Sequence, residues 1–407
     1  MTTNAETPIL KANRLIISHD KNLSFNDLIE PNLTVFSNFR LMYSTNNTVS
    51  DFGYTSLDKI ETQCSSLQKF FYGNGLLFFS KDIYQSQQRQ KVVKIPLDYS
   101  LSFDSNVAEK FRIYENGGKL QPKDKFKLEN LLKFIKKYQF NFDYGFFCLE
   151  NLEFIEQKNE RPFDTLRAII RCNPLNNSLL DIEQAGKLAI SEMYNHFGIE
   201  VNSVFWQRRK LIYSMLLKAI LINWQSSGEA NFKLKEIIEF SLEKLGRFAK
   251  KEIYLSWKLF KNGDSLRFFH PINQPTKKIL SKAKGMSWDF LSIEYQSTLA
   301  YSLSQKGKFF VPFFASFDER FVEFREACPI QCMLFDDLNH EPHTYFDDEL
   351  EFNQDISDAV ESNFDLYNKL TNQTEILRRK NLLLNSNKLD CLISSLEKEV
   401  NEIKVQA

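Results

Sequence analysis

An Asn-His pair follows an apolar run in the last part of the chain. In the segment MLFDDLNHEPHTYF, Asn339 and His340 come just after Met333, Leu334 and Phe335. The apolar run has the length and continuity of a strand that is covered on both faces, so the polar pair lies just past the end of that strand. An amide and an imidazole at this place are candidate ligand-binding groups. Asn, Asp and Pro also favour turns, so a simple turn is the alternative interpretation.

Two further segments contain residue types that suit a binding site. Gly73, Asn74 and Gly75 precede the apolar LLFF, and glycines at this spacing let the backbone bend sharply and come close to a ligand. A plain turn explains the same glycines. Tyr367 lies in LYNKLTNQTEIL and is followed closely by Asn372.

Two acids stand between an expected strand and an expected helix. Asp104 in SFDSNV and Asp318 in SFDERF are placed in this way, which is similar to PIN-domain ribonucleases and would suit Mg²⁺. Both acids are also good helix caps, and their separation is long for that compact fold. His340 and His343 have a spacing found in zinc sites, but no second ligand pair accompanies them, so we expect no metal site there.

The pattern of apolar residues predicts the elements that position these segments. Leu97, Tyr99, Leu101 and Phe103 alternate with the period of a half-buried strand, and KFFVPFFASF and IQCMLF also predict strands. Residues from about 105 to 305 are mostly helical, with an amphipathic LENLLKFIKKYQF. Each strand group is too small to bury a core alone, so we expect the two groups to combine around a helical insertion.

The helical part of the chain contains a set of basic residues, and its tail contains an apolar seam. The Arg and Lys residues between positions 208 and 284 are expected to form a solvated face. The tail has an apolar seam of alternating four- and three-residue spacing, and two heptads are few for a free coiled coil. We therefore expect the tail to dock on the protein's own body through Leu389, Ile393, Leu396, Val400 and Ile403.

Composition excludes several classes of protein. The chain has 407 residues with 38 Phe but only 13 Gly and 11 Pro, which favours a packed, helix-rich body over disorder. The net charge is zero, so nucleic acid is an unlikely partner unless a basic patch holds it locally. The six Cys residues show no paired metal spacing and predict free thiols in a reducing compartment. With no signal segment and no apolar run long enough for a membrane span, we expect a cytoplasmic protein, with the nucleus as a second compartment.

In this order the segments resemble the SET-domain lysine methyltransferases, in particular the branch similar to the Rubisco large-subunit methyltransferase. In that family a Gly-x-Gly strand opens the domain, a helical insertion and an Asp-x-x-Asn-His motif follow, and a Tyr-containing segment closes it. Here YGNGLLFFSKDI looks like the opening, and FDDLNHEPH looks like the Asn-His motif, with Asp336 or Asp337 as its acid. LYNKLTNQTEILRRKNLLLNSNKLD looks like the closing segment, so the likeness covers about residues 71–392.

The resemblance implies an α+β fold, with a SET-type β-rich domain, a large helical insertion and a short helical tail. Residues 1–104 would hold the N-terminal region and the first half of the SET-like domain, and residues 306–385 its second half. Residues 105–305 would be the insertion, and residues 386–407 a short C-terminal helix.

The resemblance also implies an activity, namely S-adenosylmethionine-dependent methylation of a lysine on a non-histone protein. The Gly-Asn-Gly turn, Asn339 and His340 would bind the cofactor. Tyr367 would be catalytic, lining a narrow channel in which desolvation lowers the pKa of the target lysine and the hydroxyl orients its amine.

The chain departs from the family in its closing segment. Asn368 follows Tyr367 where the family has Gly, and Lys380, Asn381 and Leu382 stand where the family has a second tyrosine. A non-catalytic protein of the same fold that binds the cofactor is therefore one alternative, and a metal-dependent PIN-like ribonuclease is another.

Overall fold

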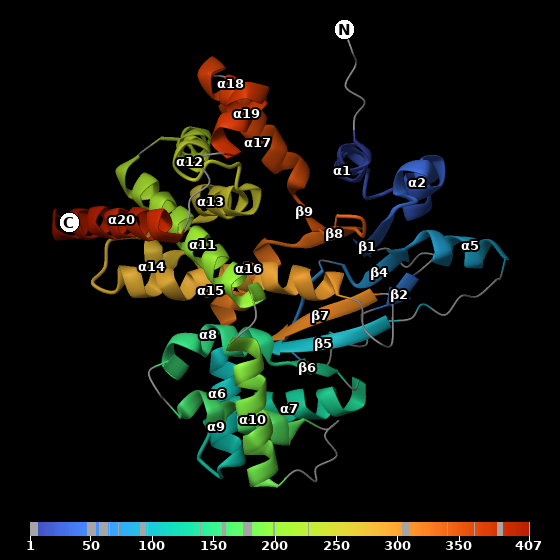
Figure 1. Cartoon of the computed structure of the whole chain (residues 1–407), viewed down its shortest axis with the longest axis vertical. Coiled ribbons are helices and arrows are strands. Elements are labelled where there is room, and N and C mark those ends of the chain that lie inside the picture. The colour runs from blue at the N-terminus through green and yellow to red at the C-terminus, as the bar shows by residue number, and fades with distance from the viewer. Residues whose placement is uncertain are drawn as a thin grey trace. The chain divides into compact units, whose positions relative to one another are not determined.

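The chain forms an α+β protein of two compact units (Figure 1). The first unit is Met1–Ile199 with Ile293–Glu349, and the second is Glu200–Ser292 with Leu350–Ala407. The computed structural model describes residues 7–46, 54–56, 64, 66–71, 73–89, 95, 97–138, 140–156, 160–173, 181–197, 200–226, 228–302, 309–339, 341–361, 363–380 and 386–406.

The first unit contains both sheets and the helices around them. Its strands are β1 (Phe39–Thr45), β2 (Tyr54–Ser56), β3 (Leu67–Lys69), β4 (Gly75–Phe79), β5 (Leu97–Phe103), β6 (Asn141–Asp143), β7 (Phe309–Ala315), β8 (Ile330–Asp336) and β9 (Glu341–Phe346). Its helices are α1 (Pro8–Ser18), α2 (Phe25–Ile29), η1 (Glu30–Asn32), α3 (Leu33–Phe36), α5 (Lys81–Arg89), α6 (Ser105–Glu115), α7 (Pro122–Tyr138), α8 (Gly145–Glu156), α9 (Arg161–Cys172), α10 (Ile182–Phe197) and α16 (Glu319–Ala327). Helices α15 (Ile279–Tyr301) and α17 (Glu349–Glu361) contribute residues to both units.

Strands from both ends of the sequence combine in each sheet, as the sequence predicted. The larger sheet has the order β2-β4-β1-β8-β9, and every pair in it is antiparallel. The apolar residues of α1 to α3 form one buried cluster with this sheet, which includes Ile16, Phe25, Phe36, Leu41, Phe79 and Leu334.

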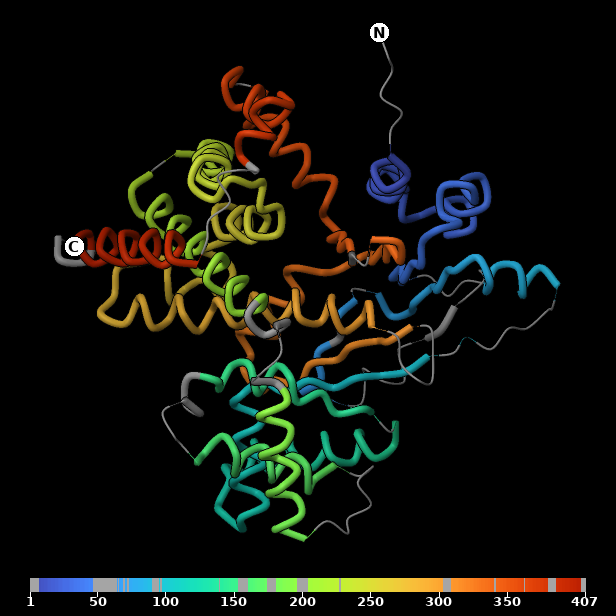
Figure 2. The backbone as a smooth tube through the Cα atoms, in the orientation of Figure 1, coloured from blue at the N-terminus to red at the C-terminus, as the bar shows by residue number. Residues whose placement is uncertain are grey.

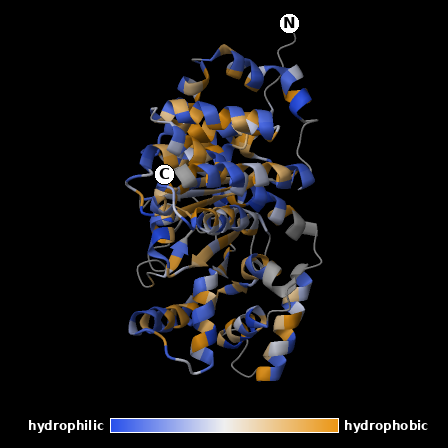
Figure 3. Cartoon of the chain, turned by 90° about the vertical axis from the view of Figure 1, so that its left-hand side faces the viewer, coloured by the Kyte–Doolittle hydropathy of each residue, from blue (hydrophilic) through white to orange (hydrophobic). Residues whose placement is uncertain are grey.

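The smaller sheet has the order β3-β7-β5-β6, in which β7, β5 and β6 are parallel. Figure 2 shows β5 and β7, which come from distant parts of the sequence, running side by side. Much of the strand backbone is coloured hydrophobic in Figure 3, as expected for strands that are buried.

Helices cover the parallel strands on both faces. On one face the ring of Phe103 lies 5.4 Å from that of Phe111 in α6. On the opposite face Phe314 lies 5.4 Å from Phe146 in α8 and 5.3 Å from Phe321 in α16. Successive residues of a strand point to opposite faces, so α6 and α16 pack on different sides of the sheet.

The sequence predicted β5 as a half-buried strand, and this prediction is wrong. Its alternate residues Ser100 and Ser102 are 1% and 0% exposed, because β5 lies between two other strands and under helices on both faces. The Ser102 hydroxyl is accommodated there because it donates a hydrogen bond to Asp143 at 2.6 Å.

The second unit is helical in its described residues. It contains α11 (Glu200–Gln225), α12 (Ala230–Lys244), α13 (Lys250–Asn262), α14 (His270–Asn273), α18 (Phe364–Thr371), α19 (Gln373–Lys380) and α20 (Ser386–Gln406). Helix α20 docks on α11, where Tyr213 donates a hydrogen bond to Glu397 at 2.8 Å. The predicted docking of the tail is thus confirmed, with Leu389, Leu396 and Val400 buried.

The units divide the chain at other positions than the segments expected from the sequence. Residues 105–199 fold with the strands instead of with residues 200–292. Among the helices that the structure describes, none is both long and apolar enough to cross a membrane.

Candidate functional site

Asn339 lies in a turn at the end of β8, as the simpler interpretation of its sequence predicted. The Asp336 side chain accepts hydrogen bonds from the backbone NH of Leu338 at 3.0 Å and of Asn339 at 3.1 Å. It also accepts one from the Asn339 amide at 2.7 Å. Burial raises the pKa of Asp336, but these hydrogen bonds lower it by more than burial raises it. The pKa therefore lies below its ordinary value. His340 lies outside the described residues.

Asp337, the second acid of this motif, is paired with a buried arginine. Arg40 in β1 binds it through two nitrogens, with Nε 2.8 Å from Oδ2 and Nη2 2.8 Å from Oδ1. The Arg40 guanidinium also lies 5.0 Å from the ring centre of Phe335. Both acids of the motif therefore hold the turn in place.

The glycine turn at the start of β4 is explained by close packing. A Cβ atom at Gly73 would lie 2.4 Å from the Thr45 carbonyl oxygen and 2.7 Å from the Ser44 hydroxyl. The Gly73 NH donates a hydrogen bond to that hydroxyl, and the Asn74 NH donates one to the Asn46 side chain at 3.3 Å. The backbone of this turn comes close to β1, so glycine is required there without any ligand.

The two predicted cofactor-binding motifs do not meet. Gly75 pairs with Thr45 at one end of β1, whereas Asp336 pairs with Phe39 at the other end. Six residue steps of a strand separate these ends by about 20 Å. The cofactor site that the resemblance implies would need the Gly73–Gly75 turn and Asn339 in one pocket, and their positions at opposite ends of β1 do not support this.

Tyr367 belongs to the second unit, in α18. Its side chain is 47% exposed, so within that unit it does not line a narrow, desolvated channel. Lys380 ends α19, and Asn381 and Leu382 lie outside the described residues.

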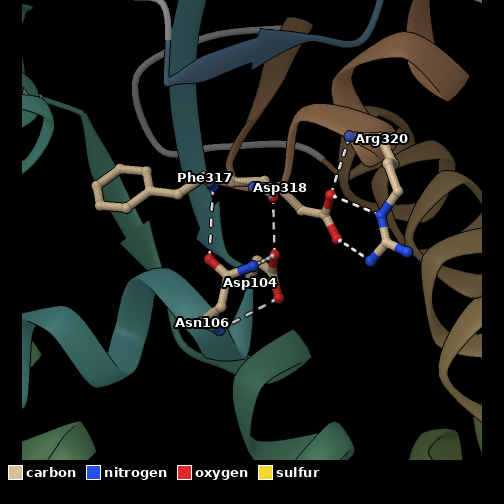
Figure 4. A network of polar contacts seen from close by, with 6 residues as sticks. Asp104, Asn106, Phe317, Asp318 and Arg320 are labelled. Atoms are coloured by element: carbon tan, nitrogen blue, oxygen red, sulfur yellow. Dashed lines mark hydrogen bonds and ion pairs between the residues drawn. The ribbon is translucent and has the colours of Figure 1, made fainter. Parts of the chain in front are cut away.

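The structure brings together the two acids that the sequence placed between strands and helices. Asp104 follows β5 and Asp318 follows β7, and these two strands are adjacent and parallel. The Ser316 hydroxyl joins the two segments, because it donates a hydrogen bond to Asp104 at 2.7 Å and accepts one from the Asp318 NH at 3.2 Å. In Figure 4 Asp104 and Asn106 face the segment that carries Phe317 and Asp318.

Both acids also cap the helices that follow them, as the alternative interpretation predicted. The Asp104 side chain accepts a hydrogen bond from the Asn106 NH at 3.3 Å, and the Asp318 side chain accepts one from the Arg320 NH at 2.9 Å. The N-termini of α6 and α16 therefore meet at this point, and helix N-termini attract anions.

The position of this acidic pair in the sheet is one at which α/β folds bind ligands. After β5 the chain passes through α6 and α7 to β6 on one side, while β7 lies on the other side of β5. The helices after β5 and β7 pack on opposite faces. Because α/β folds bind ligands in a crevice at such a point, we call the position between the carboxyl ends of these two strands the crevice. Asp104 and Asp318 stand at this crevice.

The environments of the two acids shift their pKa values in opposite directions. Burial raises the pKa of Asp104 to about 6, and the negative charge of Asp318 adds to this shift, although hydrogen bonds from Ser316 and Asn106 oppose it. Burial also disfavours the charge of Asp318, but hydrogen bonds from the side chain and backbone of Arg320 lower the pKa of Asp318. Two carboxyl groups with separated pKa values in one crevice are typical of functional sites.

A cavity of about 220 Å³ begins one residue from Asp104. It is lined by Ser105 and Glu109 of α6, Asn151 of α8 and Arg161 of α9, among others. Asn151 donates a hydrogen bond to Ser105 at 3.3 Å, and Arg161 donates one to Glu109 at 2.8 Å. The lining of this cavity therefore begins next to Asp104 on the side of α6 and contains polar groups from three helices.

Asp143, the acid at the end of β6, is held by three other groups. It accepts hydrogen bonds from Ser102 at 2.6 Å, from the Tyr295 hydroxyl at 2.8 Å and from the Gly145 NH at 3.2 Å. These bonds connect β6 and α8 to β5 and α15 through both carboxylate oxygens of Asp143.

The donor set at the crevice fits magnesium. Within the described ranges no three His, Cys, Asp or Glu side chains are arranged to hold a metal ion, so a closed protein cage for a metal is not formed there. Mg²⁺ is usually held through one or two carboxylates, with water and substrate phosphates as its other ligands. Asp104 and Asp318 provide hard oxygen ligands, and a metal ion would compete with Arg320 for the Asp318 carboxylate. A cation would also offset the burial and the repulsion that raise the pKa of Asp104.

Lysines of α7 lie beside the crevice. Lys123 pairs with Glu319 at 2.7 Å, and the Lys127 ammonium lies 5.6 Å from the ring centre of Phe317. Phe317 donates its NH to the Asn106 side chain at 3.4 Å. Lys127 thus places one positive charge over an aromatic ring next to the two carboxylates, while Glu319 offsets the charge of Lys123.

The sequence analysis missed Ser316 and Asn106, although a signal for them exists. The tripeptide Ser-Phe-Asp occurs at residues 102–104 and again at residues 316–318, each time at the start of a helix. The cavity residues on α8 and α9 carry no such signal, because only the packing of these helices brings them to α6.

Comparison with protein-family models, with curated protein sequences and with solved structures finds no match for this chain.

Proposed function

We propose that the chain is a magnesium-dependent nuclease that hydrolyses phosphodiester bonds of single-stranded RNA. The observation that carries this proposal is the pair Asp104 and Asp318, which distant parts of the sequence bring to the carboxyl ends of two adjacent parallel strands. This pair corresponds to the PIN-like ribonuclease that the sequence offered as an alternative. The larger sheet gives less support to a SET-type methyltransferase, because Gly75 and Asp336 lie at opposite ends of β1.

The chain's own residues supply the parts that phosphate chemistry needs. Asp104 and Asp318 would hold Mg²⁺, which polarises a phosphoryl oxygen and lowers the pKa of a bound water. The N-termini of α6 and α16 would attract the negatively charged phosphate. Lys123 and Lys127 of α7 would attract the RNA backbone. In the hydrolysis, the oxygen of a water molecule bonds to phosphorus, the bond to the leaving oxygen breaks, and a proton passes to that oxygen.

The ring of Phe317 and the adjacent cavity favour an unpaired strand. Phe317 is partly exposed beside Lys127, and a base can stack on such a ring. The cavity lined by Ser105, Asn151 and Arg161 has hydrogen-bonding groups that an unstacked base or a ribose can contact.

The test is cleavage of end-labelled single-stranded RNA by the full chain, with and without Mg²⁺. We expect cleavage that stops when the metal is chelated, and a loss of at least about 100-fold in rate for Asp104→Asn and for Asp318→Asn. Single-stranded DNA and duplex RNA of the same sequence are assayed in parallel. Equal cleavage of all three would contradict the preference for unpaired RNA.

Asp181→Asn is the matched control for these variants. Asp181 also caps a helix with an exposed carboxylate, since it accepts a hydrogen bond from the Gln184 NH at 2.7 Å, but it is not part of the crevice. This variant should cleave like the wild type. Wild-type activity in Asp104→Asn and Asp318→Asn would sink the proposal, and calorimetric titration with Mg²⁺ shows independently whether they still bind the metal.

The same protein is titrated with S-adenosylmethionine to test the methyltransferase expected from the motif order. Binding of this cofactor without RNA cleavage would favour a methyltransferase or its non-catalytic relative. Incubation with labelled cofactor and a cell extract then separates the two, because only the methyltransferase would label a protein lysine.

A further inference from the structure

A second cavity lies in the helical unit. It has a volume of about 310 Å³ and is lined by α11, by α20 and by the segment that follows α12. Pockets that bind small molecules begin at about this size. The cavity belongs wholly to the second unit, whereas Asp104 and Asp318 belong to the first.

Two arginines line this cavity, and one of them is paired with a buried carboxylate. Arg208 of α11 pairs with Glu252 at 2.9 Å, and the side chain of Glu252 is only 2% exposed. Within the described ranges, the Arg247 side chain has no hydrogen bond or ion pair of its own. Both guanidinium groups line the cavity, and no carboxylate is part of its lining among the described residues.

The pKa of Arg247 is lowered by its surroundings. Burial lowers the pKa of Arg247, and the charge of Arg208 lowers it further, while Glu252 raises it. An anion beside Arg247 would stabilise its charged form. Arginine binds carboxylates and phosphates with two parallel hydrogen bonds, which gives such a contact both strength and direction.

The rest of the lining is largely apolar. Leu211 of α11, Leu245 after α12 and Leu389 of α20 line the cavity beside the arginines, and Leu245 and Leu389 are buried. These leucines have little surface left to bury, but Val204, which also lines the cavity, is 61% exposed. A ligand with an apolar body would cover Val204 and pack against the leucines, which an inorganic anion would not do.

We propose that this cavity binds a small monoanionic amphiphile, with a carboxylate or phosphate monoester head on Arg247 and an apolar body against Leu211, Leu245 and Leu389. Glu252 offsets the charge of Arg208, so the charge of Arg247 favours a head of charge minus one. The volume limits the body to a short chain or one ring system. The proposal is independent of the proposed nuclease, because no residue of the crevice takes part.

The experiment uses the full chain and the fluorescent dye anilinonaphthalene sulfonate, a monoanion with an aromatic body. We expect saturable fluorescence that octanoate displaces, while neutral octanol and inorganic phosphate at the same concentration do not. Displacement by octanol as effective as by octanoate would overturn the requirement for a charge. Displacement by phosphate as effective as by octanoate would overturn the requirement for an apolar body.

Arg247→Gln removes the charge and keeps a hydrogen-bonding side chain. It should weaken dye and octanoate binding about tenfold, as expected for the loss of a charge-assisted hydrogen bond. The control Lys244→Gln removes the same charge from the exposed last turn of α12, outside the cavity lining, and should bind like the wild type. Equal affinity of Arg247→Gln and the wild type would refute the site.

A second variant tests the cavity without touching a buried residue. Val204 lines the cavity and is 61% exposed, so Val204→Trp adds bulk at the opening with little effect on folding. It should weaken binding of both dye and octanoate, and unchanged binding would also refute the site. RNA cleavage by Arg247→Gln should equal that of the wild type, which separates this site from the nuclease.

Discussion

Gly73 has no room for a side chain. Its substitution by alanine should lower the free energy of unfolding by about 1–3 kcal/mol, because the added methyl group would collide with the Thr45 carbonyl oxygen. Urea denaturation measures this change. Gly285→Ala is the control, since nothing lies within 4 Å of a Cβ atom there and alanine favours its helix. A Gly73→Ala variant of wild-type stability would reopen a ligand-binding explanation for this glycine.

Asp104 should make the stability of the chain depend on pH. Its pKa of about 6 lies above the value of about 3.9 in an unfolded chain, so the folded state binds the proton more tightly. The stability from this proton is fully present below about pH 4 and is lost as the pH rises to about 6. The wild type is then left with a buried, repelled charge at neutral pH.

Asp104→Asn removes that charge and should raise the melting temperature at about pH 8 by about 2–4 °C. The difference between variant and wild type should disappear below about pH 3, where Asp104 is protonated in both the folded and the unfolded state. Thermal unfolding followed by circular dichroism measures both values. Asp181→Asn, at an exposed cap, should show no such gain, and equal melting of Asp104→Asn and wild type at pH 8 would contradict the raised pKa.

At the scale of elements, α20 should stabilise the helical unit through its apolar seam. Leu396 is 3% exposed and lies next to Glu397, which accepts the hydrogen bond from Tyr213 of α11. Leu396→Ala should lower the free energy of unfolding by about 2–5 kcal/mol. Ser395→Ala, on the exposed side of the same helix turn, should leave it unchanged. Equal stability of the two variants would mean that α20 is not docked in solution.

The sequence predicted individual elements better than it predicted how they associate. The apolar run of β8 and the amphipathic pattern of α7 are local signals, and both elements form as expected. The seam of α20 predicted its docking for the same reason. The parallel pairing of β5 with β7 is not local, because the two strands are far apart in the sequence and no periodicity specifies a partner.

The candidate site shows the same difference between local and long-range signals. Asp104 and Asp318 were recognised as acids at strand ends, but their proximity follows only from the pairing of β5 with β7. Cofactor binding by Asn339 is predicted from the order of the three motifs along the chain. The tendency of Asn and Asp to form turns predicts the observed structure better. In the structure, the backbone NH and the side-chain amide of Asn339 both donate hydrogen bonds to Asp336, within the turn itself.

At the scale of the whole molecule, the zero net charge makes RNA binding depend on a few local cations. Removing Lys123 and Lys127 together, as glutamines, should reduce the slope of log affinity against log salt by about 1.4 for single-stranded RNA. Lys133→Gln with Lys136→Gln is the matched control, since it removes the same charge toward the far end of α7. Filter binding of the metal-free protein at several salt concentrations measures the slopes, and equal slopes would contradict the location of the RNA.

Strands β5 and β7 are neighbours in the sheet but distant in the sequence. Asp104 and Asp318 can therefore come together only late during synthesis. A nascent chain exposes Asp104 early, yet it lacks Asp318 and Ser316 until most of the protein has left the ribosome. Domains fold as their segments emerge, so the Asp104 side of the crevice forms before the side that carries Ser316 and Asp318. Under the proposed function, a ribosome-bound fragment whose β7 has not yet emerged would be unable to cut the message that encodes it, and a product of premature termination before β7 would be unable to cut RNA.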